Sequence, residues 1–571
     1  MHESTTPKLS KILSPRRVNS NALSAEHLIQ LAVFAYETHR IAGVVVNRIP
    51  QEFIDFIRIF TNQKEETVKI GRISSAEENE KGGNETGGNE SGGNETGGTE
   101  ACSIFAKKAC GSNLPLTSDM GIVDEFDHVA PRLRGKKEGT FAYFTVRDRW
   151  PKIVTSLVDQ LTRKRDALIE QHGEDASADI ADILEKFSRL RYEIMTDKPL
   201  INFPESGPDG KMWHDWMEEL KTAVMPNDVE ELTYFKGPWL FVECYLYRFI
   251  YSAFLATKKL ADMDYFEDSK RKNFLDHLDQ VEEAVAFLMK ITAKDSPAHE
   301  MFGIHQILKS SLWGNRADMS LTGGDDHTMK MSSIAASVQL KDYILIDDVN
   351  WLMVKVLAPL QANPQKLKNR RIDIVLDNAG VELCADLMMA EFFLARGFAD
   401  KVVLHGKAIP WFVSDTTEND FNWTVDSLHL AGQQSAKLGE QIKKRVEKME
   451  IIYKADLFWI SPHPYCDMQE KAPELYEELT TSSLVIFKGD LNYRKLVGDR
   501  DWDLNTSFKK AVRGFDPCPI LALRTLKAET IAGLTDDVLK VLLEKFDEDN
   551  SWMTSGEYAV CQLGGVPPIE E

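Results

Sequence analysis

Cysteine is scarce in this sequence, with seven residues among 571 and no C-x-x-C pair. Scattered cysteines in an odd number predict reduced thiols rather than a disulfide framework or a zinc site. Long apolar runs are also missing, since no stretch approaches the roughly 18 apolar residues of a membrane span. Residues 1–17 are polar and basic and lack the apolar region of a signal peptide. We therefore expect a protein of the cytoplasm, or of the nucleus as well, with no membrane partner.

Positive charge is in deficit. Lys and Arg total 68 against 89 Asp and Glu, so the formal net charge is −21. A chain of this charge repels nucleic acid and anionic lipid, and we expect a small molecule as the partner instead. An anionic substrate would then need a local basic pocket. The hydrophobic fraction of 43% and the charged fraction of 27% are those of a globular protein with a sizeable core, and they leave the oligomeric state open.

Large apolar side chains are absent from residues 76–100, where the sequence repeats GGNET and GGNES. Such a composition cannot repay the entropy lost on ordering, so we expect a disordered linker over 76–113. Residues 1–75 form an N-terminal extension, which is expected to be partly helical because apolar residues recur at helical spacing between 24 and 62.

The rest of the chain divides by the pattern of its apolar residues into 114–339 and 340–571. In the first part these residues recur three and four positions apart, which predicts helices at 150–165, 176–193, 212–220, 239–258 and 276–292. In the second part short apolar runs predict strands at 343–346, 372–376, 402–404, 411–413, 457–460, 484–487 and 520–523. Continuous apolar strands separated by helices are typical of parallel sheets. The expected fold class is α/β, a mostly parallel doubly wound sheet with helices on both faces, preceded by a helical domain.

Polar residues follow four of the predicted strands, at the end where open parallel sheets bind their ligands. They are Asp377 and Asn378, then Ser414 and Asp415, then Lys488, Gly489 and Asp490, and finally Arg524 and Lys527. Neighbouring strand ends lie roughly 4.8 Å apart. We therefore expect Asp377, Asn378 and Asp415 to share one ion, although Asp415 follows a different strand.

These three candidate ligands offer only oxygen atoms, which suits Mg²⁺ or Mn²⁺ better than zinc and leaves other divalent ions possible. The natural partner of such an ion is phosphate, and cations at the strand ends could hold the remaining phosphoryl oxygens. These cations are Lys488, Arg494, Arg524 and Lys527. The alternative is that each acid only caps the helix after its strand. A cap would explain Asp377, but neither Asn378 beside it nor the cations after two other strands.

Three common motifs are missing: the G-x-x-x-x-G-K-[ST] loop, a G-x-G-x-x-G after a strand, and the G-x-S-x-G elbow. Their absence disfavours a P-loop nucleotide site, a dinucleotide site and a serine hydrolase of the α/β kind.

Four segments are distinctive: SLWGNRADMSL at 311–321, LDNAGVELCADL at 376–387, FKGDLNYRKL at 487–496 and RTLK at 524–527. Together they resemble the metal-dependent damage-control phosphatase family, in the subfamily marked by an RTxK motif. That subfamily includes sugar-phosphate phosphatases that are also called acidic-residue or protein-glutamate methyltransferases. The resemblance covers about 114–560.

The resemblance implies metal-binding and catalytic roles for Asp377, Asn378 and Asp415, the residues that the strand ends also indicate. It implies that substrate is bound by Asp377, Asn378, Asp490, Leu491, Asn492, Tyr493, Arg494 and Lys527, to which the strand-end argument adds Arg524. It also assigns the binding of a methyl donor, S-adenosylmethionine, to Glu382 and Asp415. Whether Asp415 attacks directly or orients a metal-bound water stays open.

The first functional hypothesis is a metal-dependent phosphomonoesterase, a hydrolase of small sugar phosphates. Fructose 1-phosphate, fructose 6-phosphate and related damaged phosphometabolites are the substrates that the resemblance implies. The alternative is an S-adenosylmethionine-dependent carboxyl methyltransferase that acts on protein glutamate residues. It ranks second, because Gly380 stands alone where a Gly-rich loop would cradle the donor, and because Glu382 could equally accept a hydrogen bond behind the metal ligands. A non-enzymatic scaffold is the third hypothesis.

Overall fold

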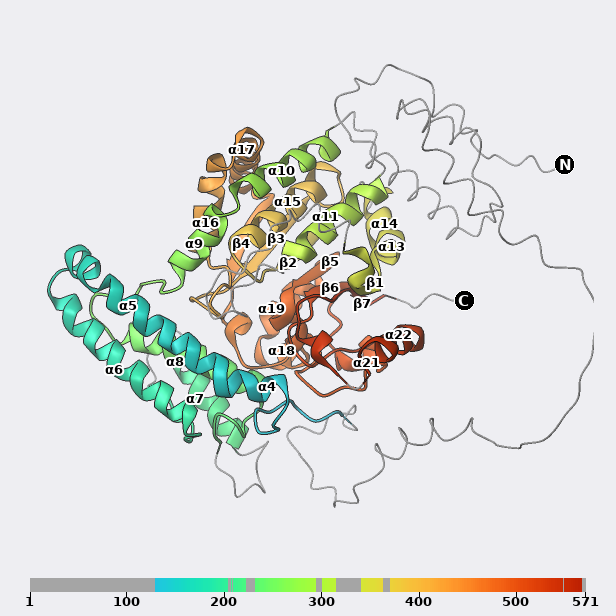
Figure 1. The fold of residues 1–571 in the computed structure, drawn as a ribbon. Helices are drawn as coiled ribbons and strands as arrows, with labels where there is room; N and C mark the ends of the chain where they lie inside the picture. Colours follow the sequence, from blue (N-terminus) through green and yellow to red (C-terminus); the bar gives the residue numbers. More distant parts are fainter. Residues whose placement is uncertain are drawn as a thin grey trace, which may run out of the picture. The chain divides into compact units, whose positions relative to one another are not determined.

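A seven-stranded sheet runs through the part of the chain that the computed structural model describes (Figure 1). The described residues are 129–203, 207, 209–221, 232–293, 300–314, 340–362, 370–547 and 549–566, and all belong to one unit of the chain, Ser118–Glu571. The predicted extension (1–75) and linker (76–113) lie outside the described residues, as do residues 315–321 of the SLWGNRADMSL segment.

The strand order is β1-β7-β6-β5-β2-β3-β4, and every neighbouring pair is parallel except β6 with β7. The strands are β1 Ile344–Asp347, β2 Arg371–Val375, β3 Lys401–Gly406, β4 Ile451–Ala455, β5 Leu484–Lys488, β6 Ile520–Thr525 and β7 Ala559–Gly564. Parallel neighbours need crossover connections, and the helices between the apolar runs supply them. The predicted α/β class with a mostly parallel sheet is confirmed.

Side chains of the central strands alternate between two cores, one on each face of the sheet. Ile374 of β2 and Ile486 of β5 enter the first core, whereas Val375 and Phe487 enter the second. Because both faces are covered, β5 and β6 are buried along their whole length, which explains why they read as uninterrupted apolar runs.

Helices cover both faces, as Figure 1 shows. Those with residues in the first core are α9 Glu267–Leu275, α10 Leu278–Thr292, α11 Glu300–Gly314, α13 Val349–Leu352, η8 Met353–Leu357, α14 Ala358–Ala362, α15 Val381–Ala395, α16 Glu418–Ser427, η9 Leu428–Leu430 and α17 Gln433–Glu447. Those with residues in the second core are η10 Leu457–Ile460, η11 Tyr465–Asp467, α18 Met468–Lys471, α19 Pro473–Thr480, α20 Gly489–Leu496, α21 Phe508–Ala511, α22 Asp536–Phe546 and η12 Ser551–Met553. The short turn η7 Lys341–Tyr343 precedes β1.

A third core lies among the helices that precede the sheet in the sequence. These are α4 Phe141–Phe144, η3 Thr145–Arg149, α5 Trp150–His172, α6 Asp175–Met195, α7 Gly210–Glu219 and α8 Trp239–Leu255. Their core also includes Trp411, Phe412 and Leu491, so this helical region packs against the carboxyl end of the sheet. The five predicted helices are confirmed. The boundary predicted at 339/340 stays a prediction, and α10 and α11, which precede it, pack against α15.

The strand predictions failed at four places. The run at 411–413 is a turn, in which Phe412 and Val413 have φ angles of 45° and 70°. Its apolar side chains pack into the helical core instead of a sheet.

The run at 457–460 is the 3-10 turn η10, which begins at Asp456 because that side chain accepts the N–H of Phe458. Strands β4 and β7 were missed, and β4 reads weakly because it lies at the sheet edge and is half exposed.

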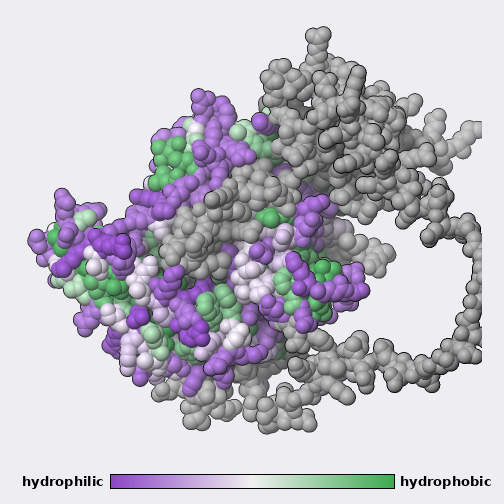
Figure 2. Space-filling view, in the orientation of Figure 1, coloured by the Kyte–Doolittle hydropathy of each residue, from purple (hydrophilic) through white to green (hydrophobic). Residues whose placement is uncertain are grey.

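The surface seen in Figure 2 is largely hydrophilic where residues are described, with smaller apolar areas between. None of the described helices has the length and apolar content that crossing a membrane requires. The described cysteines form no disulfide, and they are Cys244, Cys384, Cys466, Cys518 and Cys561.

Candidate active site

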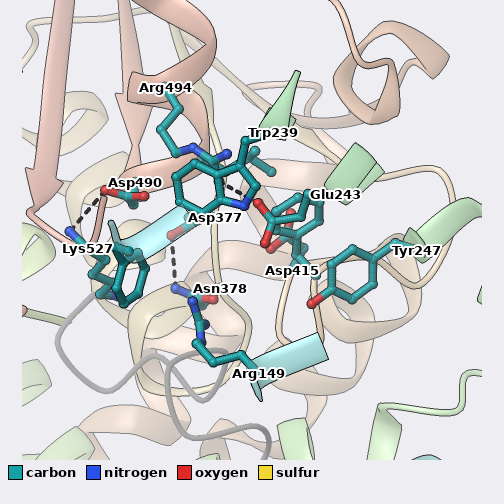
Figure 3. Close-up of a pocket in the computed structure, with 13 residues that line it drawn as sticks. Arg149, Trp239, Glu243, Tyr247, Asp377, Asn378, Asp415, Asp490, Arg494 and Lys527 are labelled. Carbon is teal, nitrogen blue, oxygen red and sulfur yellow. Dashed lines mark hydrogen bonds and ion pairs between the residues drawn. The ribbon is translucent and has the colours of Figure 1, made fainter. Parts of the chain in front are cut away.

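One pocket gathers most of the residues that the strand ends indicated (Figure 3). It is a hollow of about 500 Å³, a volume that includes the solvent at its mouth. The α/β part contributes Asp377, Asn378, Phe412, Asp415, Asp490, Leu491, Arg494 and Lys527, and the helical region contributes Phe141, Arg149, Trp239, Glu243 and Tyr247. The pocket therefore lies between the carboxyl end of the sheet and the helices that cover it, where open α/β sheets bind ligands.

Asp415 reaches this pocket on a loop rather than on a strand of its own. The loop folds back along the residues that follow β2, so that Asn378 and Asp415 form an isolated antiparallel bridge. The amide of Ala379 donates to the carbonyl of Ser414, and the amide of Thr416 donates to the carbonyl of Asp377, each at 2.8 Å. The structure thus brings Asp415 beside Asp377 and Asn378, as expected, by a different route.

Neither aspartate caps a helix, so the alternative role is excluded. Helix α16 begins at Thr417, whose side chain forms a capping box with Asp420. Helix α15 begins at Gly380 without any side-chain cap. The carboxylates of Asp377 and Asp415 therefore do not serve to initiate the helices that follow them.

The amide of Asn378 has a determined orientation. Its Nδ2 donates to Asp377 Oδ2 at 3.0 Å and to Glu382 Oε2 at 2.7 Å, while Oδ1 accepts the hydroxyl of Ser414 at 2.5 Å. Both amide hydrogens face carboxylate oxygens, which only accept hydrogen bonds, so the amide oxygen must be the atom that faces Ser414. The second lone pair of Oδ1 is the part of this side chain that can bind a cation.

Gly489 makes room for the carboxylate of Asp377. This glycine opens α20 with φ of 80°, and a Cβ atom on it would lie 1.8 Å from Asp377 Oδ2. Any other residue would displace the carboxylate and strain the backbone. The turn after β5 is thus shaped around the end of β2.

The donor set fits a hard divalent cation. Asp377, Asn378 and Asp415 are 4%, 5% and 2% exposed, and two buried carboxylates that face one pocket repel each other until a cation shares them. Among the described residues no three His, Cys, Asp or Glu side chains are grouped so that they could hold a metal ion by themselves, so a site here depends on the amide oxygen of Asn378 as the third donor. Two carboxylates and an amide oxygen suit Mg²⁺ or Mn²⁺ and leave coordination positions for substrate.

The candidate cations differ in their surroundings. Lys527 lines the pocket, and its backbone N–H donates to Asp490 Oδ1 at 3.1 Å. Arg494 also lines the pocket, but its Nη1 lies 2.6 Å from Glu243 Oε2 and its Nε lies 2.7 Å from Asp499 Oδ1. Burial opposes the charge of Arg494, yet Asp499 and Glu243 outweigh it and raise the pKa of the guanidinium. Its charge is already balanced, so Arg494 mainly joins α8 to α20.

Arg524 and Lys488 lie behind the pocket rather than in its lining. Both are fully buried. Arg524 donates to Asp490 Oδ1 at 2.8 Å and to the carbonyls of Thr530 and Ala528, at 2.5 and 2.9 Å. Lys488 lies 2.8 Å from Glu382 Oε1 and 2.9 Å from Asp386 Oδ1. These cations support the side chains around the site.

The segment 490–494 divides by helical periodicity. Asp490, Leu491 and Arg494 lie on the face of α20 that lines the pocket. Asn492 and Tyr493 point elsewhere: Asn492 donates to the carbonyl of Lys488 at 2.7 Å, and the hydroxyl of Tyr493 donates to Gln562 at 3.0 Å. Glu382 is likewise absent from the lining, because it is buried between Asn378 and Lys488.

The residues of the helical region that line the pocket were not predicted from the sequence. Trp239, Glu243 and Tyr247 are spaced by four residues and therefore share one face of α8. Glu243 is the one acid in α8, a mostly apolar helix whose other charged residue is Arg248, and this acid was the available signal. Arg149 ends the π-helical turn η3, a conformation frequent at functional sites, and its guanidinium carbon lies 5.2 Å from the centre of the Phe141 ring.

Residues 145–540 match the profile of a known family, described as the damage-control phosphatase ARMT1-like domain. The chain is similar to the damage-control phosphatase ARMT1 of Xenopus laevis, with 38% identity over 75% of this chain and 97% of the relative. The Danio rerio protein of that name is 38% identical over 76% and 96%, and the Homo sapiens protein is 36% identical over 76% and 99%. A DUF89 family protein from Pyrococcus horikoshii aligns with 16% identity and a TM-score of 0.34, over 72% of this chain and 96% of that chain.

Proposed function

Because this chain belongs to the ARMT1-like damage-control phosphatase family, we propose that it is a metal-dependent phosphatase, a hydrolase of damaged phosphometabolites. The observation that carries the proposal is the group of Asp377, Asn378 and Asp415, which line one pocket together with Lys527. Acids at one side of a pocket and a cation at another suit an ester whose phosphate is shared between a metal ion and the protein.

We propose that Asp377, Asn378 and Asp415 hold Mn²⁺ or Mg²⁺. When bound, such an ion polarises a phosphoryl oxygen and neutralises charge that develops in the transition state. The chain itself keeps the three ligands oriented: Ser414 and Glu382 hold the amide of Asn378, and Gly489 leaves space for the carboxylate of Asp377.

The phosphate is proposed to lie between the metal ligands and Lys527. Lys527 is 4% exposed and lines the pocket, so its charge acts in a partly desolvated environment. Arg149, which lines the same pocket from the helical region, is a second candidate for a phosphoryl oxygen. A substrate held in this way has its leaving group toward the face of α8.

The proposed substrates are small sugar phosphates such as fructose 1-phosphate and fructose 6-phosphate. Glu243 and Asp490 line the pocket and can accept hydrogen bonds from sugar hydroxyls. Tyr247 and Phe412, whose rings stack with centres 4.4 Å apart, provide a rigid apolar surface beside these acids. Acids next to aromatic rings suit a polyol, which has both hydroxyl groups and an apolar face.

A phosphate-release screen tests the proposal. The full chain is stripped of metal with a chelator and supplied with Mn²⁺ or Mg²⁺ beside a panel of sugar phosphates, while methyl-donor binding is titrated in parallel. We expect release only with metal. Lys527→Ala should lower kcat/KM by roughly 10- to 150-fold, as the loss of a charge-assisted hydrogen bond of about 1.5–3 kcal/mol predicts.

The matched control is Arg396→Ala, since Arg396 lies at the C-terminal end of α15 and does not line the pocket. It should leave kcat/KM unchanged. Phosphate release that survives complete chelation, or a panel in which no ester is hydrolysed, would contradict the proposal. Binding of the methyl donor without any phosphatase activity would favour the methyltransferase alternative.

A further inference from the structure

Lys407 lies directly behind Asp415, outside the pocket lining. Its Nζ lies 3.1 Å from Asp415 Oδ2 and donates to the carbonyl of Leu376 at 3.0 Å. The two side chains are 1% and 3% exposed, so the ion pair is shielded from solvent. A buried lysine thus joins a candidate metal ligand to the backbone at the end of β2.

The backbone around Lys407 binds the same loop. Its amide donates to the carbonyl of Thr416 at 2.9 Å, and the amide of Thr416 donates to the carbonyl of Asp377 at 2.8 Å. Within this loop Phe412 and Val413 adopt left-handed φ angles of 45° and 70°, which are costly for bulky and β-branched residues. Such a conformation persists only when the surrounding contacts impose it. Lys407 supplies two of these contacts, one from its backbone and one from its side chain.

The ion pair also fixes which oxygen of Asp415 faces Lys407. Oδ2 is buried, with essentially no accessible surface, and it faces Lys407. Asp415 also lines the pocket, so the lysine holds this carboxylate from behind while its residue faces the candidate site. Without Lys407 the carboxylate could rotate and present either oxygen.

We propose that Lys407 is a positioning residue that orients Asp415 for the metal-dependent reaction and, by its positive charge, weakens the affinity of the site for a divalent cation. The inference rests on the proposed function, because it takes Asp415 as a ligand. Two carboxylates and one lysine leave the site with a net charge of about −1 rather than −2. Lys407 therefore orients Asp415 but weakens the electrostatic attraction of the site for a divalent cation.

The two effects of Lys407 have opposite signs, and this separates positioning from a merely structural role. In Lys407→Met, Mn²⁺ should bind roughly tenfold more tightly because a repelling charge is gone. At the same time kcat should fall by about 100-fold because Asp415 is no longer oriented. A residue that only stabilised the fold would weaken metal binding and turnover together.

The experiment measures Mn²⁺ affinity calorimetrically without substrate, and kcat at saturating Mn²⁺, for the full-length chain and its variants. Lys407→Arg retains the charge but not the geometry, so its Mn²⁺ affinity should stay near that of the unchanged protein while kcat falls. This second variant tests the proposal even if Lys407→Met does not fold. The control is Lys454→Met. Lys454 lies on β4 beside His405 of β3, is 44% exposed and pairs with Glu478. Its replacement should leave both Mn²⁺ affinity and kcat unchanged.

Mn²⁺ affinity and kcat that fall together in Lys407→Met, or a kcat that does not change in either variant, would overturn the role of Lys407 while leaving the phosphatase proposal intact. Failure of the unchanged protein to bind Mn²⁺ or to hydrolyse any ester would overturn both.

Discussion

At the scale of single residues, the role of each charged side chain near the pocket depends on which group it pairs with. Asp377 and Asp415 line the pocket, on two segments whose backbones hydrogen-bond to each other. Arg524 and Lys488 instead lie behind it and form ion pairs with protein carboxylates. Residues of the same chemical type therefore have different roles, and substitution should separate them.

Substitution of either carboxylate should abolish metal-dependent phosphatase activity. For Asp377→Ala and Asp415→Ala we expect kcat/KM to fall by roughly two orders of magnitude or more, because each removes one of few ligands, and excess Mn²⁺ should not restore it fully. Phosphate release and a cooperative melting curve are the measurements. Asp426→Ala, which removes an exposed aspartate of α16, is the control. Asp415→Ala with full activity would show that Asp415 is not a ligand.

Gly489 should be required for activity beyond its effect on stability. Gly489→Ala and Gly397→Ala both place a side chain at a left-handed φ, 80° and 72°, so each should lose about 1–2 kcal/mol of unfolding free energy. A Cβ on Gly397 meets nothing within 4 Å, whereas a Cβ on Gly489 would meet the Asp377 carboxylate. Only Gly489→Ala should also lose Mn²⁺ affinity and turnover. Equal losses of activity in the two variants would contradict this account of the turn.

At the scale of elements, helices far apart in the sequence are joined by single carboxylates. Glu282 of α10 accepts the backbone N–H groups of Gln434 and Ser435 at the start of α17, each at 2.9 Å. This side chain supplies acceptors that the helix start lacks, because the residue before α17 is Gly432. Burial opposes the carboxylate, but these hydrogen bonds outweigh it and lower the pKa of Glu282 below 4.5.

The junction between α10 and α17 should weaken at low pH. Since the folded-state pKa of Glu282 is depressed, its contribution is fully present above the unfolded value of 4.5 and is lost as the pH falls through the folded-state value. Glu282→Gln should cost about 1 kcal/mol at pH 7. The difference from the unchanged protein should shrink as the pH falls below about 4, where the unchanged carboxyl also protonates. Denaturant unfolding at pH 7 and at a pH below about 4 tests this prediction. The control is Glu283→Gln, which changes an exposed carboxylate of the same helix. A difference that does not depend on pH would exclude this role.

At the scale of the whole molecule, the candidate site needs both the sheet and the helices that precede it. Glu243 and Arg494, from these two regions, form a buried ion pair in the wall of the pocket. The described residues that line this pocket all lie between Phe141 and Lys527.

Removal of the first hundred residues should therefore leave catalysis unchanged. A shortened chain that begins at Ala101 retains every candidate site residue as well as the whole unit Ser118–Glu571. Its kcat/KM for the best sugar phosphate should equal that of the full chain at the same Mn²⁺ concentration. A shortened chain that folds but has lost turnover would place part of the active unit within residues 1–100.

The sequence by itself determined the α/β class, the order of most helices and central strands, and the position of Asp377 and Asn378 at the strand end that lines the pocket. These features depend on local patterns: apolar periodicity along each element, and polar residues directly after a buried strand. Strand β5 was predicted because both of its faces are buried, and β4 was missed because an edge strand carries a weaker pattern. The sequence also indicated Asp415, although the segment before it was predicted as a strand and is a turn.

Only the tertiary structure decided which cations line the pocket and which other residues complete it. Nothing in the sequence separates Lys527 from Lys488, because the difference is one of position: Lys527 lines the pocket, whereas Lys488 is buried against Glu382 and Asp386 of another element. The α8 wall is likewise more than a hundred residues away from Asp377 along the chain. Charge pairing and pocket shape depend on distances between elements, and these distances are set by how the elements pack rather than by any one segment.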